Sequence, residues 1–153
     1  MNTPSSLRET IRLNIPASLK CLNVLSECLA AILAHVPDSQ NMDITTYNIQ
    51  LALHEICINI MKHAYDEHAY DEQHASDRIE VVMVLDLQTN GVEIDLFDDG
   101  TPFDKQQDVE PDLVHGQIHG YGLFLAKNLM DSVSYERLDQ KNHWCLTKKL
   151  GLS

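Results

Sequence analysis

The sequence predicts an α+β fold: a two-layer α/β sandwich in which a mixed, mainly antiparallel sheet carries its helices on one face. Five short segments have the alternating or β-branched pattern of strands, and three longer segments have apolar residues at helical spacing. The segments follow one another in the order β-α-α-β-β-loop-α-β-β. Antiparallel hairpins whose helices must share one face form such a sandwich.

The first half of the chain predicts one strand and two helices. Residues 10–15 alternate between apolar and polar side chains, which is typical of a half-buried strand. Ser18 can cap a helix whose leucines recur at helical spacing as far as the breaker residues 37–39. A second helix is expected from Asp43, a good capping residue, to about Tyr65.

A hairpin follows in the middle of the chain. Residues 79–87 are rich in β-branched side chains, and residues 92–97 alternate, so both segments are expected to be strands. The turn between them contains Asn90 and Gly91, a pair that tolerates the positive φ of a tight hairpin.

The rest of the chain predicts a loop, a helix and a second hairpin. Residues 99–119 have no clear period, and an irregular stretch of this length is usually a functional lid or binding loop. A helix is expected from about Tyr121. Strands at 133–138 and 144–150 then close the chain, joined by a polar turn at 139–142.

Length and composition indicate a single soluble domain spanning residues 1–153. The formal net charge of −12 argues against direct binding to nucleic acid or to an anionic membrane. No apolar run approaches the ~20 residues that a membrane span needs. The four cysteines have no C-x-x-C spacing, so reduced thiols in a cytoplasmic protein are expected.

Glu55 and Asn59 are the first candidate pair for chemistry. They are one turn apart on the second expected helix and therefore point from the same side of it. Both lie beside the apolar stripe, where a buried polar group without a partner costs free energy of kcal/mol order. Each should have a partner or a ligand, although the pair alone also fits the polar flank of an amphipathic helix.

The segment Asp98-Asp99-Gly100 ends an otherwise apolar strand. A carboxylate at a strand end can accept a hydrogen bond from an exocyclic amine such as that of adenine. A glycine there lets a flat ring approach the backbone. Because Asp-Gly is also a common turn dipeptide, a simple turn is the alternative.

The segment Gly120-Tyr121-Gly122 precedes the third helix, and the N–H groups at a helix N-terminus form an anion site. A bare G-x-G is a weak signal, and a plain loop is the alternative. The preceding loop holds one cation, Lys105, among four acidic residues. Phosphate charge would therefore have to be met by Mg²⁺ and backbone N–H groups rather than by a lysine clamp.

The eight histidines do not predict a metal site. Those in the second helix and the following loop lack the H-E-x-x-H or paired-cysteine spacing of zinc sites. The chain also lacks a G-x-S-x-G motif, a Walker lysine loop and a Rossmann fingerprint.

Together and in this order, the motifs resemble those of a known family. Residues 55–65 (EICINIMKHAY) look like the N box of the gyrase, chaperone and histidine-kinase ATPase superfamily. Their His-Ala-Tyr ending is the form seen in its small anti-sigma-factor serine kinases. Residues 98–104 (DDGTPFD) resemble the first glycine box, and residues 120–131 (GYGLFLAKNLMD) resemble the second.

The resemblance implies a Bergerat-type sandwich that uses ATP and Mg²⁺. Glu55 would be the general base that activates a serine hydroxyl on a partner protein, and Asn59 would coordinate Mg²⁺. Asp98 would accept a hydrogen bond from the adenine amine, and Thr147 would lie near the water at the adenine site. The residues implied in nucleotide binding are Asn59, His63, Asp98, Gly100, Phe103, Gly120, Tyr121, Gly122, Leu123 and Thr147.

Members of the resembled family bind a sigma factor and phosphorylate a STAS-domain antagonist protein on serine, usually as homodimers. The resemblance therefore implies an ATP-dependent serine-protein kinase that acts as an anti-sigma factor, without nucleic acid or membrane as a partner. The alternative is a nucleotide-binding regulatory module that sequesters a partner protein without significant kinase activity.

Overall fold

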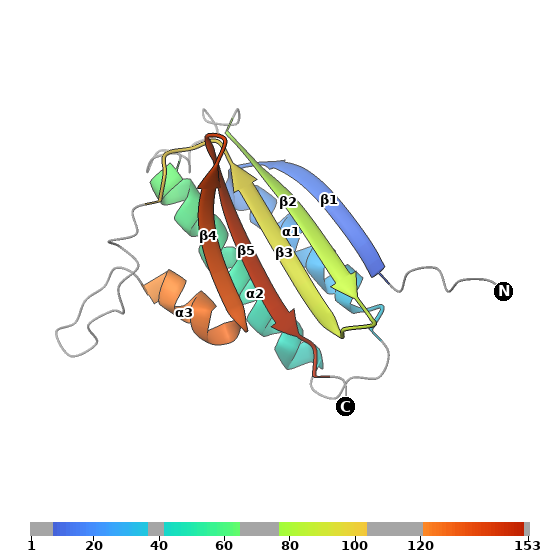
Figure 1. Ribbon diagram of the computed structural model, residues 1–153. Coiled ribbons are helices and arrows are strands. Elements are labelled where there is room, and N and C mark those ends of the chain that lie inside the picture. The colour runs from blue at the N-terminus through green and yellow to red at the C-terminus, as the bar shows by residue number, and fades with distance from the viewer. Residues whose placement is uncertain (1–7, 37–41, 65–76, 104–120, 152–153) are drawn as a thin grey trace.

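The protein has two layers, a five-stranded sheet and a layer of helices on one of its faces (Figure 1). The computed structural model describes residues 8–36, 42–64, 77–103 and 121–151. The strands are β1 (Arg8–Pro16), β2 (Arg78–Asp86), β3 (Gly91–Asp98), β4 (Ser132–Leu138) and β5 (Lys141–Lys149). The helices are α1 (Leu19–Leu33), α2 (Met42–Asn59) and α3 (Tyr121–Leu129). The expected α+β sandwich is confirmed.

The strand order is β1-β2-β3-β5-β4, and all four pairs of neighbouring strands are antiparallel. The parallel component of the expected mixed sheet is therefore missing from the strands that the structure describes. The chain reaches the edge strand β4 through α3 and then turns back, so that β5 pairs with β3. This pairing sets Asp98 opposite Asn142 at one end and Gly91 opposite Lys149 at the other.

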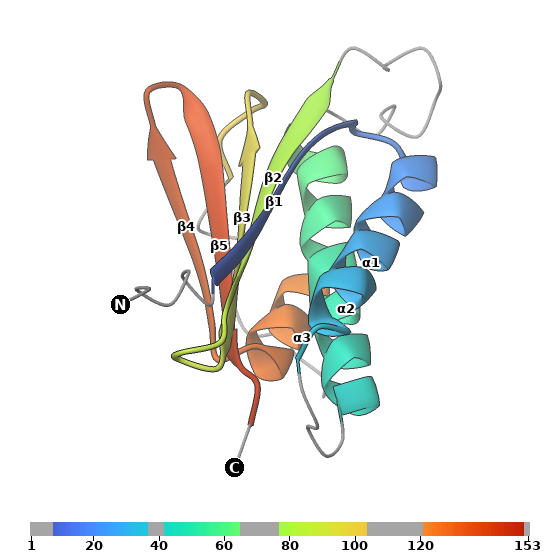
Figure 2. The same cartoon turned by 90° about the vertical axis from the view of Figure 1, so that its right-hand side faces the viewer.

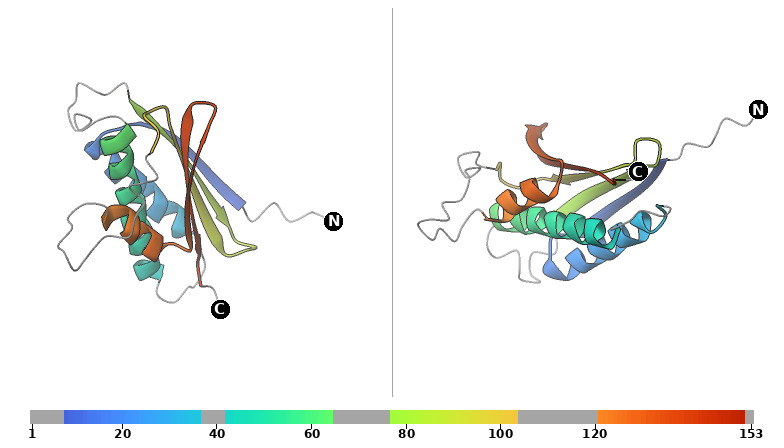
Figure 3. Two further views of the ribbon diagram at one scale, coloured as in Figure 1. Left: turned by 60° about the vertical axis from the view of Figure 1, so that its left-hand side comes forward. Right: turned by 90° about the horizontal axis from the view of Figure 1, so that it is seen from below.

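Alternation along the strands gives the sheet an inner face, which packs on the helices, and an outer face turned away from them. Figure 2 and Figure 3 show all three helices on the inner side. The buried residues of β3 and β5 are Val92, Ile94, Leu96, Asp98, Asn142, Trp144 and Leu146. Because directly opposite residues of an antiparallel pair face the same side, Asp98 and Asn142 both belong to the inner face.

The helices α1 and α2 cover the inner face with apolar stripes. The buried residues of these stripes are Leu22, Leu25, Leu29, Ile32, Leu33, Ile49, Ala52, Leu53, Ile56 and Cys57. The side-chain amide of Gln50 donates to the carbonyl of Ser26 at 2.9 Å and ties the helices together. Ser18 is the N-cap of α1 as expected, but it makes no capping bond, because its hydroxyl is directed to the thiol of Cys21 at 3.4 Å.

The expectation of reduced cysteines is consistent with the structure, in which all four are free. Burial raises the pKa of Cys57 to about 12, so this thiol is a neutral member of the core. No helix in the described part of the chain is long and apolar enough to cross a membrane.

The second helix does not continue as a regular α-helix to Tyr65. It ends at Asn59 and is followed by a π-helical turn at Ile60–Ala64. A π-turn holds an extra residue and is frequent at functional sites. It changes the direction of the side chains immediately after Asn59. Tyr65 lies outside the described residues.

The first hairpin turn is shifted by one residue from the expected position, and the second is tighter than the sequence indicates. Asn90 has φ of 52°, as expected, but Gly91 already begins β3. Asp139 and Gln140 have φ of 53° and 65°, which is the requirement of a two-residue turn. The expected four-residue turn at 139–142 is therefore wrong, since Asn142 is a buried residue of β5.

Candidate functional site

A hollow lies on the inner face of the sheet, where the ends of β3 and β5 meet the last residue of α2. Its lining residues are Asn59, Ile60, Asp98, Thr101, Phe103, Asn142 and Trp144. Its volume of about 10 Å³ is that of a single water-sized site, far below the roughly 300–1,000 Å³ of a pocket for a whole small-molecule ligand. The hollow therefore marks a point where polar and aromatic side chains converge, and a flat ring would bind there only after the lining side chains move apart.

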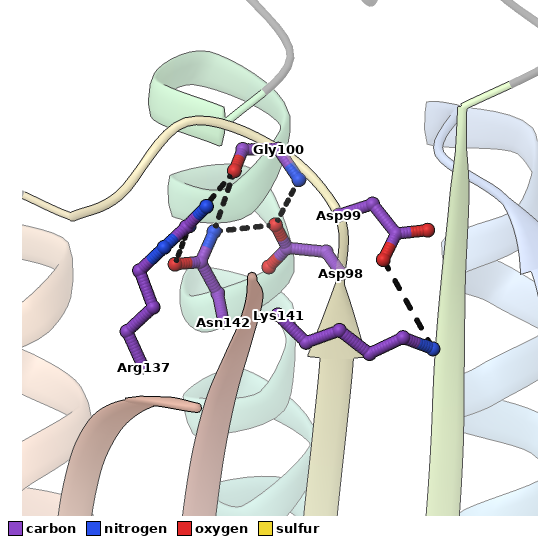
Figure 4. Close-up of polar contacts among 6 residues, drawn as sticks. All are labelled: Asp98, Asp99, Gly100, Arg137, Lys141 and Asn142. Atoms are coloured by element: carbon purple, nitrogen blue, oxygen red, sulfur yellow. Dashed lines mark hydrogen bonds and ion pairs between the residues drawn. The ribbon is translucent and has the colours of Figure 1, made fainter. Parts of the chain in front are cut away.

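Asp98 and Asn142 are two buried polar residues beside this hollow, only 3% and 2% exposed (Figure 4). The amide nitrogen Nδ2 of Asn142 donates to Oδ1 of Asp98 at 2.7 Å. The backbone N–H of Gly100 donates to the same oxygen at 2.9 Å. The second bond closes a local turn, so one carboxylate oxygen both pairs with β5 and shapes the chain after β3.

Asn142 uses its whole hydrogen-bonding capacity at this point. Its Nδ2 also donates to the carbonyls of Gly100 and Thr101, at 3.2 and 2.9 Å. Its Oδ1 accepts from the Tyr135 hydroxyl at 2.5 Å and from the Arg137 guanidinium at 2.9 Å. Arg137 donates to the Gly100 carbonyl as well, at 3.1 Å. A single buried amide therefore fixes the segment that follows β3.

The second carboxylate oxygen of Asp98, Oδ2, is buried without a hydrogen-bond partner among the described residues. A buried polar atom in that state costs about 1–3 kcal/mol. Burial raises the pKa of Asp98, although its hydrogen bonds from Asn142 and Gly100 act in the opposite direction. A ligand with an N–H donor would satisfy Oδ2 and favour the ionised carboxylate.

Two aromatic side chains, Phe103 and Trp144, form the apolar side of the hollow, and Tyr135 packs against both of them. Their ring centroids lie 4.9–5.4 Å apart in edge-to-face or tilted arrangements. The backbone N–H of Phe103 donates to the Tyr135 hydroxyl at 2.9 Å, which holds Phe103 in place. A flat ring entering the hollow would meet aromatic edges on one side and Asp98 on the other.

Asn59 is the last residue of α2 and lines the hollow. Glu55 lies one helical turn earlier and faces α3. A Cβ atom on Gly122 would lie 2.5 Å from Oε2 of Glu55, so glycine leaves the room that this carboxylate occupies. Gly122 is the second residue of α3. The first four N–H groups of a helix lack intrahelical acceptors and carry its positive dipole end. The carboxylate and these donors therefore share the space between α2 and α3.

Four of the residues expected from the sequence meet at or beside the hollow: Asn59, Asp98, Gly100 and Phe103. Glu55 and Gly122 meet each other instead. Tyr121 begins α3 and is half-buried, whereas Leu123 is only 7% exposed and belongs to the hydrophobic core. Gly120 and the side chain of His63 lie outside the described residues.

Thr147 does not lie at the hollow. It is opposite Glu93 in the register and five residues along β5 from Asn142, a separation of about 17 Å at roughly 3.4 Å per residue. The odd number of steps also puts Thr147 on the outer face, where its hydroxyl is hydrogen-bonded to Ser132. Thr147 therefore lies apart from Asp98, and Asn142 is the residue of β5 that contacts Asp98.

The sequence did not predict Asn142, the two residues that donate to it, Tyr135 and Arg137, or Trp144, which also lines the hollow. One signal was available, because a two-residue turn at 139–140 makes Asn142 the second residue of its strand and directs it inward. The pairing of β5 with β3, which brings Asn142 to Asp98, has no such local signal.

The residues at the site fit a magnesium nucleotide. The Oδ2 of Asp98, which has no partner among the described residues, fits an exocyclic amine, and the aromatic cluster fits the face or edge of a purine. Asn59, at the margin of the hollow, offers the kind of oxygen ligand that Mg²⁺ prefers.

The fold and the hollow define a class of protein, an α+β sandwich with a polar and aromatic hollow where β3 and β5 meet the end of α2. Residues 15–148 match the model of the histidine kinase-like ATPase domain, and the chain belongs to this family. The resemblance expected from the motifs is thereby confirmed.

Individual proteins that are similar to this chain have more specific names than the family has. The serine-protein kinase RsbW of Bacillus thuringiensis (strain Al Hakam) is 28% identical over 133 residues, which cover 82% of this chain and 76% of the relative. The RsbW of Bacillus cereus (strain Q1) is 27% identical with the same coverage. The solved structure of the RsbU and RsbW domains of a Mycobacterium tuberculosis protein has a TM-score of 0.62 at 17% identity. The match covers 93% of this chain and 32% of that longer chain, and it shows a shared fold.

Proposed function

We propose that this protein is an ATP-dependent serine-protein kinase that acts as an anti-sigma factor. The observation that carries the proposal is Oδ2 of Asp98, which is buried without a hydrogen-bond partner among the described residues, at the wall of the hollow between β3, β5 and α2. Adenine has an exocyclic amine that can donate to this oxygen. The relatives named serine-protein kinases support the reaction class, and the family supports the use of ATP.

In this proposal the base is held by the ends of β3 and β5. Asp98 accepts a hydrogen bond from the amine through Oδ2, while Asn142 keeps its other oxygen in place. Gly100 lies beneath the ring, and Phe103 and Trp144 exclude water from its edge. The phosphates would extend toward the start of α3, where Gly122 offers a backbone N–H group, and we propose the same role for Gly120, which lies outside the described residues.

The two residues proposed to act in phosphoryl transfer, Glu55 and Asn59, both lie on α2. Mg²⁺ bound at Asn59 would neutralise phosphate charge. The Glu55 carboxylate accepts the proton of the serine hydroxyl as the serine oxygen bonds to the γ-phosphorus. The bond from that phosphorus to the β-phosphate oxygen breaks, and ADP leaves. The close approach of Gly122 to Glu55 positions the carboxylate beside the phosphate-binding helix end.

The partners proposed are a sigma factor and a STAS-domain antagonist protein, which carries the accepting serine. A net charge of −12 makes direct binding to nucleic acid unfavourable, so regulation of transcription would act through protein contacts. We further propose that residues 1–153 form one ATPase domain, that the protein works as a homodimer, and that it is cytoplasmic.

The experiment that tests the activity compares Glu55→Ala and Glu55→Gln with the unchanged protein. Each is incubated with γ-labelled ATP and a STAS-domain protein, and phosphoserine is measured by mass shift. Transfer is expected to fall by a factor of about 10²–10⁴ in both variants, while nucleotide affinity stays close to that of the unchanged protein. Glu27→Ala, which removes an exposed carboxylate of α1, serves as the control. Undiminished transfer in the Glu55 variants contradicts the assigned role.

The same assay separates the kinase from a regulatory binding module. In the sequence, residues 104–112 include four acidic residues and one lysine, and this negative charge, unfavourable for a phosphoryl group, is the observation that favours the module. A module would bind ATP and its partner without any phosphoserine appearing in the unchanged protein.

A further inference from the structure

The outer face of the sheet carries a second polar cluster, on the same two strands as the hollow but on their opposite side. It consists of Glu93 and Asp95 from β3 and Cys145 from β5. Cys145 is directly opposite Asp95, and Glu93 is two residues along β3, so all three side chains leave the sheet in one direction. One ligand atom from each residue lies within 4.8 Å of the other two.

The spacing of these atoms is close to that of a metal site. Zinc binds oxygen at about 2.0–2.2 Å and sulfur at about 2.3 Å, which sets tetrahedral ligands roughly 3.3–3.8 Å apart. The Sγ of Cys145 and Oε1 of Glu93 are already 3.3 Å apart. Small side-chain rotations would bring the Asp95 carboxylate to the same spacing. All three residues are half-buried, which limits competition from water but leaves a path for an ion.

A separate set of contacts holds Asp95 from its other side. The Nε2 of His143 is 2.6 Å from Oδ1 of Asp95, and its Nδ1 is 3.0 Å from Oε1 of Glu136. The imidazole stacks on Phe97, with ring centroids 4.4 Å apart and an interplanar angle of 9°. Ligating carboxylates of metal sites are typically fixed by such outer hydrogen bonds. The second carboxylate oxygen of Asp95 can then turn to an ion.

We propose that Glu93, Asp95 and Cys145 bind a thiophilic divalent cation of the zinc type. A thiolate favours zinc over Mg²⁺, which takes oxygen ligands, so this site differs in chemistry from the magnesium site proposed at Asn59. On binding, the Cys145 thiol loses its proton to solvent, and a sulfur–metal bond replaces its contact to Glu93. Three protein ligands leave a fourth position for water.

The site would join β3 to β5 close to the nucleotide hollow. Asp95 is three residues before Asp98 on β3, and Cys145 is three residues after Asn142 on β5. An odd number of steps separates the members of each pair, so the ion would lie on the outer face and the base on the inner face. The cation would brace the strand pair that carries both without touching the nucleotide.

Cobalt tests the proposal directly, because Co²⁺ takes zinc sites and shows a charge-transfer absorption only when a thiolate binds it. The reduced, full-length protein is titrated with Co²⁺ in the absence of nucleotide. We expect the thiolate band to saturate at one equivalent and to disappear when Zn²⁺ is added. Cys145→Ser should abolish the band, whereas Cys28→Ser, which changes a half-buried thiol of α1, should keep it.

A second variant guards against a folding defect in the first. Glu93→Gln keeps the thiol and the side-chain shape, and it should weaken Co²⁺ binding by at least about tenfold. Thermal unfolding of the metal-free variants checks that each is folded. Absence of the band in the unchanged protein, a band that persists in Cys145→Ser, or cobalt absorption without thiolate character would each overturn the proposal.

Discussion

The strand pair β3–β5 carries two polar clusters on opposite faces, and their carboxylates differ in burial and in hydrogen bonding. On the inner face, Asp98 is 3% exposed and one of its oxygens has no partner among the described residues. On the outer face, the Asp95 side chain is 18% exposed and is bonded to His143. The inner cluster suits a donor on a flat ring, while the outer cluster suits an ion that arrives with part of its water. Alternation along one strand is enough to separate these two environments.

The largest effect is expected from a substitution on the inner face. Asn142→Ala removes the partners of Asp98, Gly100 and Thr101 together and leaves buried polar groups unsatisfied. We expect a loss of about 3 kcal/mol in the free energy of unfolding, measured with urea. Asn128→Ala, which removes an exposed amide bonded to the Phe124 carbonyl, should cost less than about 1 kcal/mol. Equal losses in the two variants would contradict the role of Asn142.

Asp98→Asn should alter the pH dependence of stability. Burial raises the pKa of Asp98 in the folded protein, so its contribution to stability is fully present below the unfolded pKa of about 3.9. That contribution is lost as the pH rises through the raised folded pKa. The asparagine variant lacks this loss. The free energy of unfolding of Asp98→Asn, relative to that of the unchanged protein, should therefore increase from pH 4 upward. Urea unfolding at pH 4 and pH 7 measures the gain.

The control for this prediction is Asp99→Asn, which changes the neighbouring carboxylate, 74% exposed. It should leave the pH profile close to that of the unchanged protein. A profile that is altered by Asp99→Asn but not by Asp98→Asn would show that the buried carboxylate is not responsible.

Gly122→Ala tests the contact between α3 and Glu55. The added Cβ would lie 2.5 Å from Oε2, and the flexible carboxylate would have to move away. We expect phosphoryl transfer to a STAS-domain protein to fall about tenfold, because small displacements of a catalytic group are costly. Gly91→Ala is the matched control, since a Cβ there meets its nearest neighbour at 3.5 Å. Equal phosphoryl transfer by Gly122→Ala and Gly91→Ala would contradict a role of Gly122 in catalysis.

The smallest effect is expected on the outer face at Thr147. Thr147→Val keeps the shape of the side chain and removes its hydrogen bond to the hydroxyl of the exposed residue Ser132. Stability should change by less than about 1 kcal/mol, and nucleotide affinity, measured by calorimetry, should not change. A large loss of nucleotide affinity would show that Thr147 contributes to binding of the base.

Much of the fold could be predicted from the sequence because its signals are local. The alternation at 10–15 and 92–97, the leucine stripe of α1 and the Asn90 turn each depend on neighbouring residues. The antiparallel pairing of β5 with β3 has no local signal. The π-turn after Asn59 could not be predicted either, since the same apolar spacing fits a continuous α-helix.

The site was predictable to the extent that its residues form contiguous motifs. Asn59, Asp98 and Phe103 belong to such motifs, and the structure brings them together. Asn142 is 44 residues from Asp98 and reaches it only through the sheet register. The outer cluster has the same origin, because Cys145 and Glu93 are 52 residues apart and match no metal-binding spacing.

The most direct test of the central claim compares two nucleotides that differ in the group facing Asp98. ATP has an exocyclic amine that donates to Oδ2, whereas inosine triphosphate has an oxygen at that position and would face the carboxylate with another acceptor. We expect ATP to bind at least about tenfold more tightly. The preference should vanish in Asp98→Asn, whose amide nitrogen can replace the partnerless oxygen. Equal binding of the two nucleotides by the unchanged protein would contradict the assignment of the hollow to adenine.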